Sequence, residues 1–367
     1  MNKVFLDLNY YSEKTKKPDL LIKKFNYSLG YLPYLKDKTQ TISLNRIGIN
    51  FSMRKEGVHY LFYKGRKIKK YSIPFVYHNF INKLAPDYIL IHGMGYGRYS
   101  YFLRKKLRKK AIILVQVQGY AEAPKGLKKL IYTWADKYID GYFFTGKENA
   151  KDWVASGVFD NNKVFEVMEG AANFTFNPEI KRKKESFLWV GRLDKNKDPI
   201  TVLSAFQKYL TKEPLATLTM VYNGFELLEE VNELLSSSTP LKQAVNTIGK
   251  LDRKEIELLY QTHEYFVLGS HYEGSGFALA EAMTCGCVPI VTSIPSFNYM
   301  TNNGACALLF EPGNGEELFN AFCKTKTIDY SKKQSELLQC VEDKLTHKAI
   351  AEDIYQTFHY LESKKQE

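Results

Sequence analysis

Short runs of apolar, β-branched or aromatic residues alternate along this chain with segments long enough to form helices. Such runs are typical of strands buried on both faces, and their alternation with helices predicts parallel sheets covered by helices. We expect strands in the first half at 3–8, 87–92, 111–117, 140–145 and 164–168, and in the second half at 186–190, 217–222, 245–249, 264–269, 288–292 and 306–310. Residues 9–80, which are rich in Tyr and Lys, predict only hairpin-like fragments without an order.

Two sets of strands predict two doubly wound α/β domains, because 367 residues exceed what one core normally holds. We place the first domain at 1–175 and the second at 176–343, because Asn-Pro at 177–178 and a charged run at 181–184 interrupt the pattern. The segment 344–367 is expected to be a helix that crosses back to the first domain. Its apolar residues recur at helical spacings, at Ile350, Ile354, Phe358 and Leu361.

The composition, 44% hydrophobic and 25% charged, is that of a soluble globular protein. No run approaches the roughly 20 apolar residues that span a bilayer. Five cysteines, an odd number, argue against a disulfide framework and favour a reducing compartment, so we expect a cytoplasmic location. The only C-x-C pair, Cys285 and Cys287, lacks the partners of a zinc site, and we expect no metal.

The positive charge is concentrated in the first half of the chain. Residues 1–175 contain 31 Lys and Arg against 14 Asp and Glu, whereas the remainder contains 21 against 26. The basic run at 104–110, with Lys125, Lys128 and Lys129 nearby, predicts a helix that rests on an anionic membrane surface at the inner face of the membrane. A merely solvated helix face is the alternative. No nucleic-acid-binding module is apparent, so we expect no nucleic-acid partner.

The segment 268–292 carries two glutamates around a glycine turn. A strand ends near residue 269, Gly276 lets the backbone turn, and a helix is expected to start at 275–277. Free amides at a helix start bind phosphate, and the carboxyl edge of a parallel sheet is where open α/β folds bind ligands. Glu273 before the turn and Glu281 on the helix suit hydrogen bonds to a sugar ring and a ribose. The alternative is a surface pair without function.

A second strand-and-loop segment, 187–200, carries two cations. Arg192 and Lys197 bracket the loop, and a helix opened by Pro199 follows. Two cations at the carboxyl edge of a sheet would neutralise a diphosphate, the arginine as a fork and the lysine as a point charge. A solvated basic loop is the alternative.

Together these two segments resemble the donor half of the group 1 (family 4) glycosyltransferases, which have the GT-B fold. The resemblance covers about 186–320 and includes Gly191-Arg192-Leu193, Lys197, the Glu-x7-Glu pair and the stretch 303–318. It implies two Rossmann-like domains facing each other across a cleft. It also implies retaining transfer of a hexose-type sugar from a nucleoside-diphosphate sugar, which serves as co-substrate, without a metal or another cofactor.

The resemblance also implies individual roles. Glu273 would contact the transferred hexose, while Arg192 and Lys197 would hold the diphosphate, and we treat these three as the catalytic residues. The donor-binding set adds Glu281 at the ribose and residues bordering the base or phosphates, namely Gly191, Lys250, Leu251, Gly276, Phe277 and Ala278. The acceptor is expected to be a saccharide or glycolipid in the synthesis of cell-surface polysaccharide.

Two departures from the family pattern keep alternatives open. The first strand ends in Asp7–Ser12 rather than a glycine-rich loop, and Gln118 stands where many members have a histidine. Gln118 is therefore one acceptor-side candidate. His92 is the other, because the glycine-rich segment 92–98 follows a strand and could line the cleft from the acceptor side. A catalytically silent subunit that binds a sugar nucleotide or a lipid remains an alternative, as does another GT-B enzyme such as an epimerase or a phosphorylase.

Overall fold

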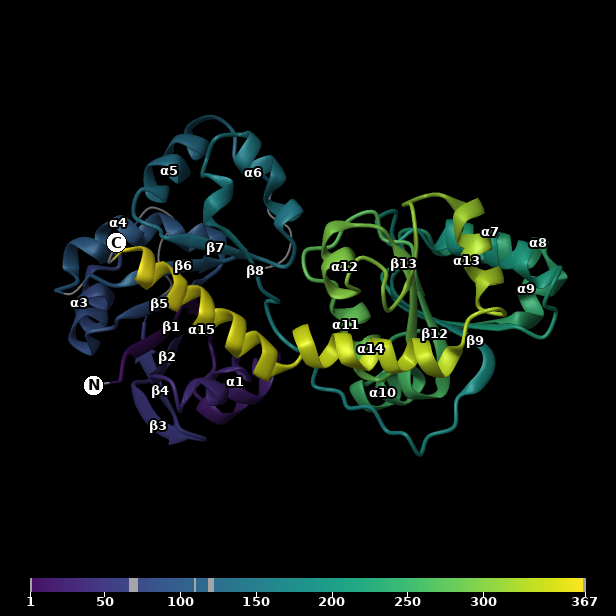
Figure 1. The fold of residues 1–367 in the computed structure, drawn as a ribbon, viewed down its shortest axis with the longest axis horizontal. Coiled ribbons are helices and arrows are strands. Elements are labelled where there is room, and N and C mark those ends of the chain that lie inside the picture. Colours follow the sequence, from purple (N-terminus) through teal and green to yellow (C-terminus); the bar gives the residue numbers. More distant parts are fainter. Residues whose placement is uncertain (1, 66–71, 109, 118–121, 366–367) are drawn as a thin grey trace. The chain divides into compact units, whose positions relative to one another are not determined.

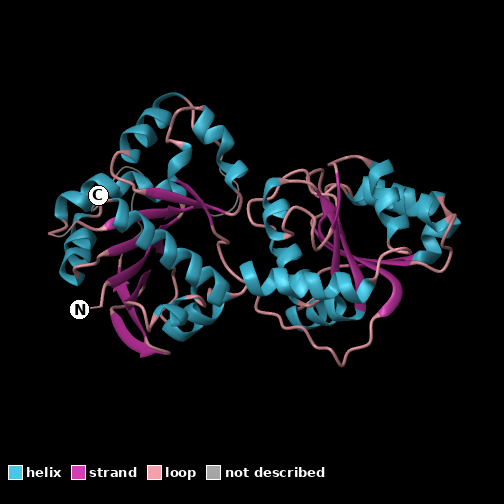
Figure 2. Ribbon diagram, in the orientation of Figure 1, coloured by secondary structure: helices cyan, strands magenta, loops and turns pink. Residues whose placement is uncertain are grey.

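The computed structural model describes residues 2–65, 72–108, 110–117 and 122–365. The chain divides into two compact units. Unit 1 consists of residues 1–171 and 346–367, and unit 2 consists of residues 172–345. Each unit is built on one central sheet with helices around it (Figures 1 and 2). Unit 2 is therefore an insertion into the sequence of unit 1.

Unit 1 contains an eight-stranded sheet of order β3-β4-β2-β1-β5-β6-β7-β8. All neighbouring strands are parallel except the β3–β4 hairpin, whose turn places Glu56 and Gly57 at positive φ. The strands are β1 (Val4–Ser12), β2 (Gln40–Ile47), β3 (Phe51–Lys55), β4 (Val58–Lys64), β5 (Tyr88–His92), β6 (Ile112–Gln116), β7 (Gly141–Phe144) and β8 (Val164–Glu166). The interval 9–80, which the sequence left without an order, thus supplies β2 and the edge hairpin.

Helices surround the sheet of unit 1. They are α1 (Pro18–Lys24), α2 (Asn26–Leu29), α3 (Phe75–Leu84), α4 (Ser100–Lys106), α5 (Gly126–Asp136), α6 (Lys151–Ala155) and α15 (His347–Lys364), with 3₁₀ turns η1 (Leu32–Leu35), η2 (Met94–Tyr99), η3 (Lys147–Ala150) and η4 (Asn161–Lys163). None of the helices in the described part of the chain has the length and apolar character that crossing a membrane requires.

Alternating residues of β1 show how the two faces of the sheet are covered. Leu6 belongs to a buried cluster that includes Tyr77 and Ile81 of α3 and Trp153 of α6. Phe5 points to the other face, because successive side chains of a strand alternate. There Phe5 and Tyr88 contact the ring of Phe358 in α15, with centroids 5.6 and 5.0 Å apart. The C-terminal helix is therefore part of the core of unit 1.

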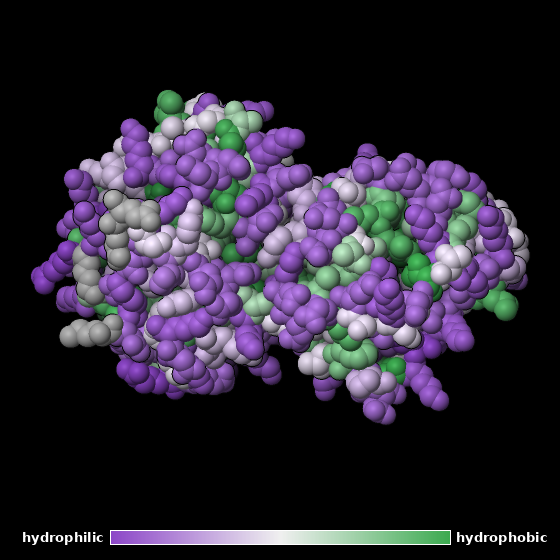
Figure 3. All heavy atoms as spheres, in the orientation of Figure 1, coloured by the Kyte–Doolittle hydropathy of each residue, from purple (hydrophilic) through white to green (hydrophobic). Residues whose placement is uncertain are grey.

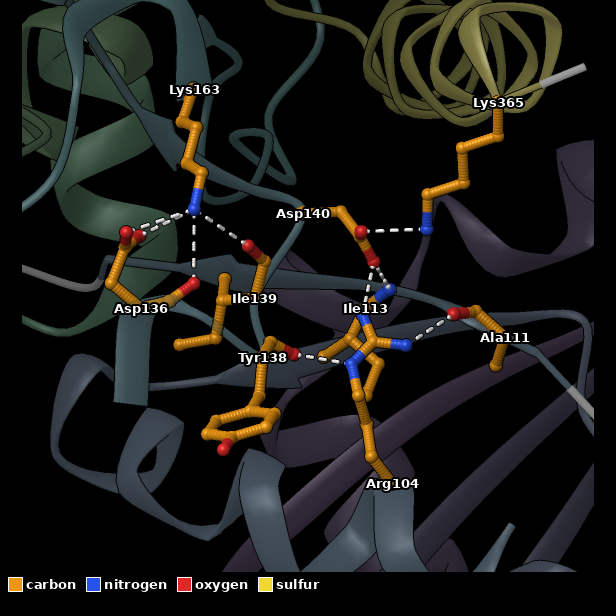
Figure 4. Close-up of polar contacts among 9 residues, drawn as sticks. All are labelled: Arg104, Ala111, Ile113, Asp136, Tyr138, Ile139, Asp140, Lys163 and Lys365. Carbon is orange, nitrogen blue, oxygen red and sulfur yellow. Dashed lines mark hydrogen bonds and ion pairs between the residues drawn. The ribbon is translucent and has the colours of Figure 1, made fainter. Parts of the chain in front are cut away.

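The basic run at 104–110 does not form one helix, and that prediction was wrong. Helix α4 ends at Lys106, and Leu107 is extended. The guanidinium of Arg104 donates to the carbonyls of Tyr138 and Ala111 at 2.7 and 2.9 Å and pairs with Asp140 at 2.5 Å (Figure 4). Arg104 thus stabilises the turn between α4 and β6. The other described basic residues of the run, Lys105, Lys106, Arg108 and Lys110, are exposed. Lys109 lies outside the described residues.

Unit 2 contains a six-stranded parallel sheet of order β11-β10-β9-β12-β13-β14. Its strands are β9 (Lys183–Arg192), β10 (Thr217–Asn223), β11 (Val245–Ile248), β12 (His263–Leu268), β13 (Val288–Thr292) and β14 (Leu308–Phe310). The helices are α7 (Pro199–Leu210), α8 (Leu228–Ser237), α9 (Thr239–Ala244), α10 (Arg253–Thr262), α11 (Phe277–Thr284), α12 (Pro295–Met300), α13 (Gly315–Lys324) and α14 (Tyr330–Lys344). Cys285 and Cys287 are buried as free thiols beside this sheet.

Candidate functional site

The strand order of unit 2 places a crevice beside β9. From β9 the chain continues to β10 and β11 on one side of the sheet, and the remaining strands, from β12 to β14, add on the other side. Helical crossovers leave a gap at such a reversal, and open α/β sheets bind ligands there, beyond the carboxyl ends of the strands. Arg192 ends β9, the loop after β9 carries Lys197, and the loop after β12 carries Glu273.

A pocket of about 270 Å³ lies at this edge of the sheet. Six of the ten site residues predicted in unit 2 line it, namely Gly191, Arg192, Lys197, Lys250, Leu251 and Ala278. The remaining lining residues are Val190, Val221, Tyr222, Asn223 and Ile256. A lining that combines apolar residues with the cations Arg192, Lys197 and Lys250 suits a ligand that joins a flat ring to an anionic group.

The loop after β9 is shaped by Asp194 and Asp198. The amide of Lys197 donates to the carbonyl and the carboxylate of Asp194, at 3.1 and 2.9 Å. Asp198 then caps α7 by accepting from the amide of Thr201 at 3.2 Å, and Pro199 takes the first helical position. The loop therefore holds the backbone of Lys197 firmly while the lysine side chain crosses to the next loop.

Lys197 and Glu273 form an ion pair. The ammonium of Lys197 contacts Oε1 of Glu273, and the hydroxyl of Ser270 donates to the same oxygen at 2.8 Å. Both charged side chains are 13% exposed, so the pair is largely shielded from solvent, and Lys197 lines the pocket. Because both contacts use Oε1, the other carboxylate oxygen is available to a ligand hydroxyl.

Arg192 is held more loosely than Lys197. Its side chain is 63% exposed and its Nε pairs with Asp194 at 2.9 Å. Exposed ion pairs contribute little to stability, so a better anionic partner can displace Asp194 at small cost. In the β9–β10 register Arg192 lies opposite Asn223, and both residues line the pocket.

The turn into α11 depends on Gly276. This residue has φ +68°, and a Cβ placed there would come within 2.6 Å of the Phe297 ring. Glycine is therefore required both by the left-handed backbone and by the close approach of that ring. The amides of Leu279 and Ala280 bond back to the carbonyl of Gly276, at 3.0 and 3.1 Å. The helix starts beside Ala278, which lines the pocket, so its positive end faces the site.

Glu281 lies one turn further along α11 and is not among the residues that line the pocket. Burial raises the pKa of its carboxyl to about 7, and the positive charge of Arg253 in α10 opposes that rise. The structure therefore places Glu281 of α11 near Arg253 and Tyr260 of α10.

The acceptor-side candidate His92 lies in unit 1, at the carboxyl end of β5. It is buried, and its Nε2 is 2.5 Å from Oδ2 of Asp7. Burial alone would lower the pKa of His92, but the carboxylate of Asp7 reverses the effect and raises it. Asp7 also accepts from Tyr31 at 2.8 Å and Ser43 at 3.1 Å. His92 lines a pocket of about 110 Å³ together with Asn9, Asn45 and Arg46. Gln118 lies outside the described residues.

Four residues that the sequence analysis did not single out take part in these arrangements. They are Asp7, the partner of His92; Asp194, the partner of Arg192; Ser270, which donates to Glu273; and Asn223, which lines the pocket. Asp7 stands between Leu6 and Leu8 in a predicted buried strand, and this position could have marked it. Among the described residues no group of three or more His, Cys, Asp or Glu side chains is placed to hold a metal ion.

Comparison with known proteins places the site in context. Residues 172–335 match the family described as glycosyl transferases group 1. The GDP-mannose:cellobiosyl-diphosphopolyprenol alpha-mannosyltransferase of Xanthomonas oryzae pv. oryzae is 30% identical over 112 residues, which cover 30% of this chain and 30% of that protein. The UDP-Gal:alpha-D-GlcNAc-diphosphoundecaprenol alpha-1,3-galactosyltransferase of Escherichia coli is 25% identical over 215 residues, covering 53% of this chain and 54% of that protein.

The alignments thus span only 30% and 54% of the length of these two curated relatives. Among solved structures, the sucrose-phosphate synthase from Thermosynechococcus elongatus superposes with a TM-score of 0.65 at 15% identity, covering 99% of this chain and 100% of that one. This likeness confirms the predicted fold class, GT-B with two parallel-sheet α/β domains.

Proposed function

Residues 172–335 belong to the group 1 glycosyl transferases, and we propose that this protein transfers a hexose-type sugar from a nucleoside-diphosphate sugar to a saccharide or glycolipid acceptor. The observation that carries the proposal is the pocket beside β9. It combines apolar walls, the three cations Arg192, Lys197 and Lys250 and the start of a helix, and Lys197 pairs with Glu273. The apolar walls suit a nucleoside, and the positive charges suit a diphosphate.

The chemistry follows from the charges that glycosyl transfer creates. As the sugar–phosphate bond breaks, negative charge grows on the departing diphosphate and positive charge on the sugar. Lys197, Arg192 and the start of α11 provide positive electrostatic potential where the negative charge grows. Lys197 and the start of α11 are in place before the reaction, so little reorganisation of these two groups opposes the transition state. We propose that the transfer proceeds without a metal, because these groups can neutralise the departing diphosphate.

We further propose that the anomeric configuration is retained without a covalent enzyme intermediate. Oε1 of Glu273 is held by Lys197 and Ser270, which favours a carboxylate that positions the sugar over one that attacks it. The acceptor hydroxyl then attacks from the side of the departing phosphate. Its proton passes to the phosphate oxygen that leaves.

The acceptor is the least defined substrate. Two curated relatives act, by their names, on saccharides linked to diphosphopolyprenol or diphosphoundecaprenol. This supports a lipid-linked saccharide as the acceptor class, and with it a role in cell-surface polysaccharide synthesis. The cytoplasmic location expected from the cysteines stays a prediction.

A donor screen tests the proposal directly. The full chain is incubated with GDP-mannose, UDP-galactose, UDP-glucose or UDP-N-acetylglucosamine, and thermal stabilisation and release of nucleoside diphosphate are both measured. We expect one donor to stabilise the protein and to be turned over in the presence of an acceptor. Stabilisation without any turnover across acceptors would instead support the silent-subunit alternative, and no stabilisation by any nucleotide would overturn the assignment of the pocket.

The cations have a separate test. Arg192→Ala should weaken binding of the matching nucleoside diphosphate about tenfold, while binding of the free nucleoside changes little, because only the diphosphate carries the charge. Lys195→Ala, two positions before Lys197 and not lining the pocket, is the matched control. Equal losses for both ligands would contradict a diphosphate-binding role for Arg192.

A further inference from the structure

Helix α5 of unit 1 carries its apolar residues on the outside. Leu127, Leu130, Ile131 and Trp134 follow the i, i+3, i+4, i+7 spacing that marks one helix face. Normally this stripe would be buried, yet the four side chains are 74%, 65%, 41% and 37% exposed. The side of α5 that faces the unit carries Ala135, which is buried, and Tyr132, which packs against the core of unit 1. The helix is therefore amphipathic with its apolar face turned to solvent.

The apolar surface continues from α5 onto the two neighbouring helices. The ring of Trp134 lies 4.7 Å from Tyr101 and 6.2 Å from Phe102 of α4, measured between centroids. Phe102 in turn contacts Phe75 at the start of α3, at 5.9 Å. Phe75 is 47% exposed and Val76 beside it is 71% exposed. Figure 3 shows hydrophobic atoms reaching the surface at the upper end of unit 1, over α5 and α6. We call this surface the apolar platform. It consists of Phe75 and Val76 of α3, Tyr101 and Phe102 of α4, and Leu127, Leu130, Ile131 and Trp134 of α5.

Lysines surround the apolar platform. Residues 100–137 contain ten Lys and Arg and only two acids, Glu122 and Asp136. The ammonium groups of Lys105, Lys106 and Lys128 lie 5.8 to 5.9 Å from the rings of Tyr101, Phe75 and Tyr132. Within the part of the chain that the structure describes, no ion pair joins these three lysines or Lys125 to an acid. The rim of the platform is therefore strongly positive.

Two polar anchors hold the platform on the sheet (Figure 4). At the end of α5, Asp136 receives the ammonium of Lys163 at 2.9 Å on each carboxylate oxygen, and the hydroxyl of Tyr142 donates to Asp136 at 3.0 Å. Arg104 fastens α4 through Tyr138, Ala111 and Asp140. Asp136 and Asp140 are thus each paired with a cation, and these contacts fix α5 and α4 in place.

We propose that the apolar platform docks unit 1 on a membrane surface of anionic phospholipid, with the α5 stripe inserted among the acyl chains and the lysines at the headgroups. An apolar helix face flanked by lysines is what such an interface binds. A second copy of the chain is the less favourable occupant, because two positive rims would face each other. The inference concerns unit 1 alone and stands apart from the sugar-nucleotide pocket.

Vesicle binding by the full chain, without donor or acceptor, tests the proposal. Phosphatidylcholine vesicles with and without phosphatidylglycerol are floated through a density gradient with the protein. We expect binding to the anionic vesicles, with weaker binding at high salt because the lysine contribution is screened. Leu127→Ser with Leu130→Ser should weaken the partition about a hundredfold. The control pair, Leu20→Ser with Leu215→Ser, removes two exposed leucines elsewhere and should bind like the native chain.

The lysines and Trp134 give independent measurements. Lys125→Gln with Lys128→Gln should weaken binding roughly tenfold, whereas Lys36→Gln with Lys55→Gln, which makes the same change of charge away from the platform, should not. Trp153 and Trp189 are buried, so a blue shift of the fluorescence on adding vesicles would report Trp134 and should vanish in Trp134→Phe.

Two outcomes would overturn the docking proposal. One is equal binding of the native chain and of Leu127→Ser with Leu130→Ser. The other is a native dimer in solution, seen by light scattering, that dissociates on those leucine substitutions while vesicles are ignored. Because all substituted residues are exposed, the melting temperature of each variant should equal that of the native chain. If the double leucine variant melts at a lower temperature, the single substitution Leu127→Ser replaces it.

Discussion

In both sheets the chain adds strands first on one side of a central strand and then on the other, but the polar residues beside that strand are arranged differently. In unit 1 the reversal is at β1, between β2 and β5, and in unit 2 it is at β9, between β10 and β12. Beside β1, Asp7 and His92 are buried and bonded to each other. Beside β9, the polar residues follow the strand and line an open pocket.

The difference lies in where the charged residues fall along the chain. Asp7 is inside strand β1 and fully buried, so its neighbours must satisfy it, and Tyr31, Ser43 and His92 do so. Lys197 and Glu273 lie in loops beyond the strand ends and remain 13% exposed. A charge within a strand stabilises one arrangement of the unit, whereas a charge in the following loop can exchange its partner for a ligand.

The largest expected effect is on turnover at the loop pair. Glu273→Gln keeps the size of the side chain but removes its charge, and it should lower the proposed turnover about a thousandfold by weakening contacts made in the transition state. Initial rates of nucleoside-diphosphate release measure this. Glu316→Gln, an exposed carboxylate paired with Lys208, is the control. An unchanged rate in Glu273→Gln would remove this residue from the mechanism.

The next effect should be on the stability of unit 1. Asp7→Asn leaves His92 without its ionic partner in a buried site, which should lower the free energy of unfolding of unit 1 by about 3 kcal/mol. Urea unfolding followed by the buried Trp153 reports unit 1, and the buried Trp189 reports unit 2. The transition of Trp189 should stay in place. If Asp7→Asn cost no more than Asp194→Asn, the contrast between strand and loop would be wrong.

A smaller effect is expected from the titration of Glu281. Its pKa is raised from 4.5 to about 7 in the folded chain. Between these values the unfolded state has released the proton and the folded state still holds it, so the stability of unit 2 should fall as pH rises from 4.5 to 7. We expect a loss of about 2 kcal/mol, which includes a discount for the partial exposure of the side chain. Glu281→Gln should lose this dependence, and unfolding curves at both pH values decide it.

Much of unit 2 could be predicted from the sequence because its strands are continuous apolar runs ending in loops with recognisable charges. The strands at 186–190 and 264–269 are present, and six predicted residues share one pocket. The pairing of Lys197 with Glu273 could not be predicted, because the two residues are 76 positions apart. The assigned roles of these residues stay predictions.

Unit 1 was harder to predict for a physical reason. Strand β2 buries Ser43, Asn45 and Arg46, which bond to Asp7, to Ser43 and to the carbonyl of Tyr10, respectively. Buried polar residues break the alternation from which a strand is inferred, and their partners lie far away in the sequence. Helix α5 has the opposite problem, because its apolar spacing is typical of a core helix although its stripe is exposed.

The packing of α15 on Phe5 and Tyr88 has a consequence for biosynthesis. The first strand leaves the ribosome long before its aromatic partner Phe358 has been translated, and all of unit 2 is made in between. One face of the sheet of unit 1 therefore stays exposed to solvent while unit 2 is synthesised. Nascent chains stalled before residue 346 should bind chaperones that the released chain does not need.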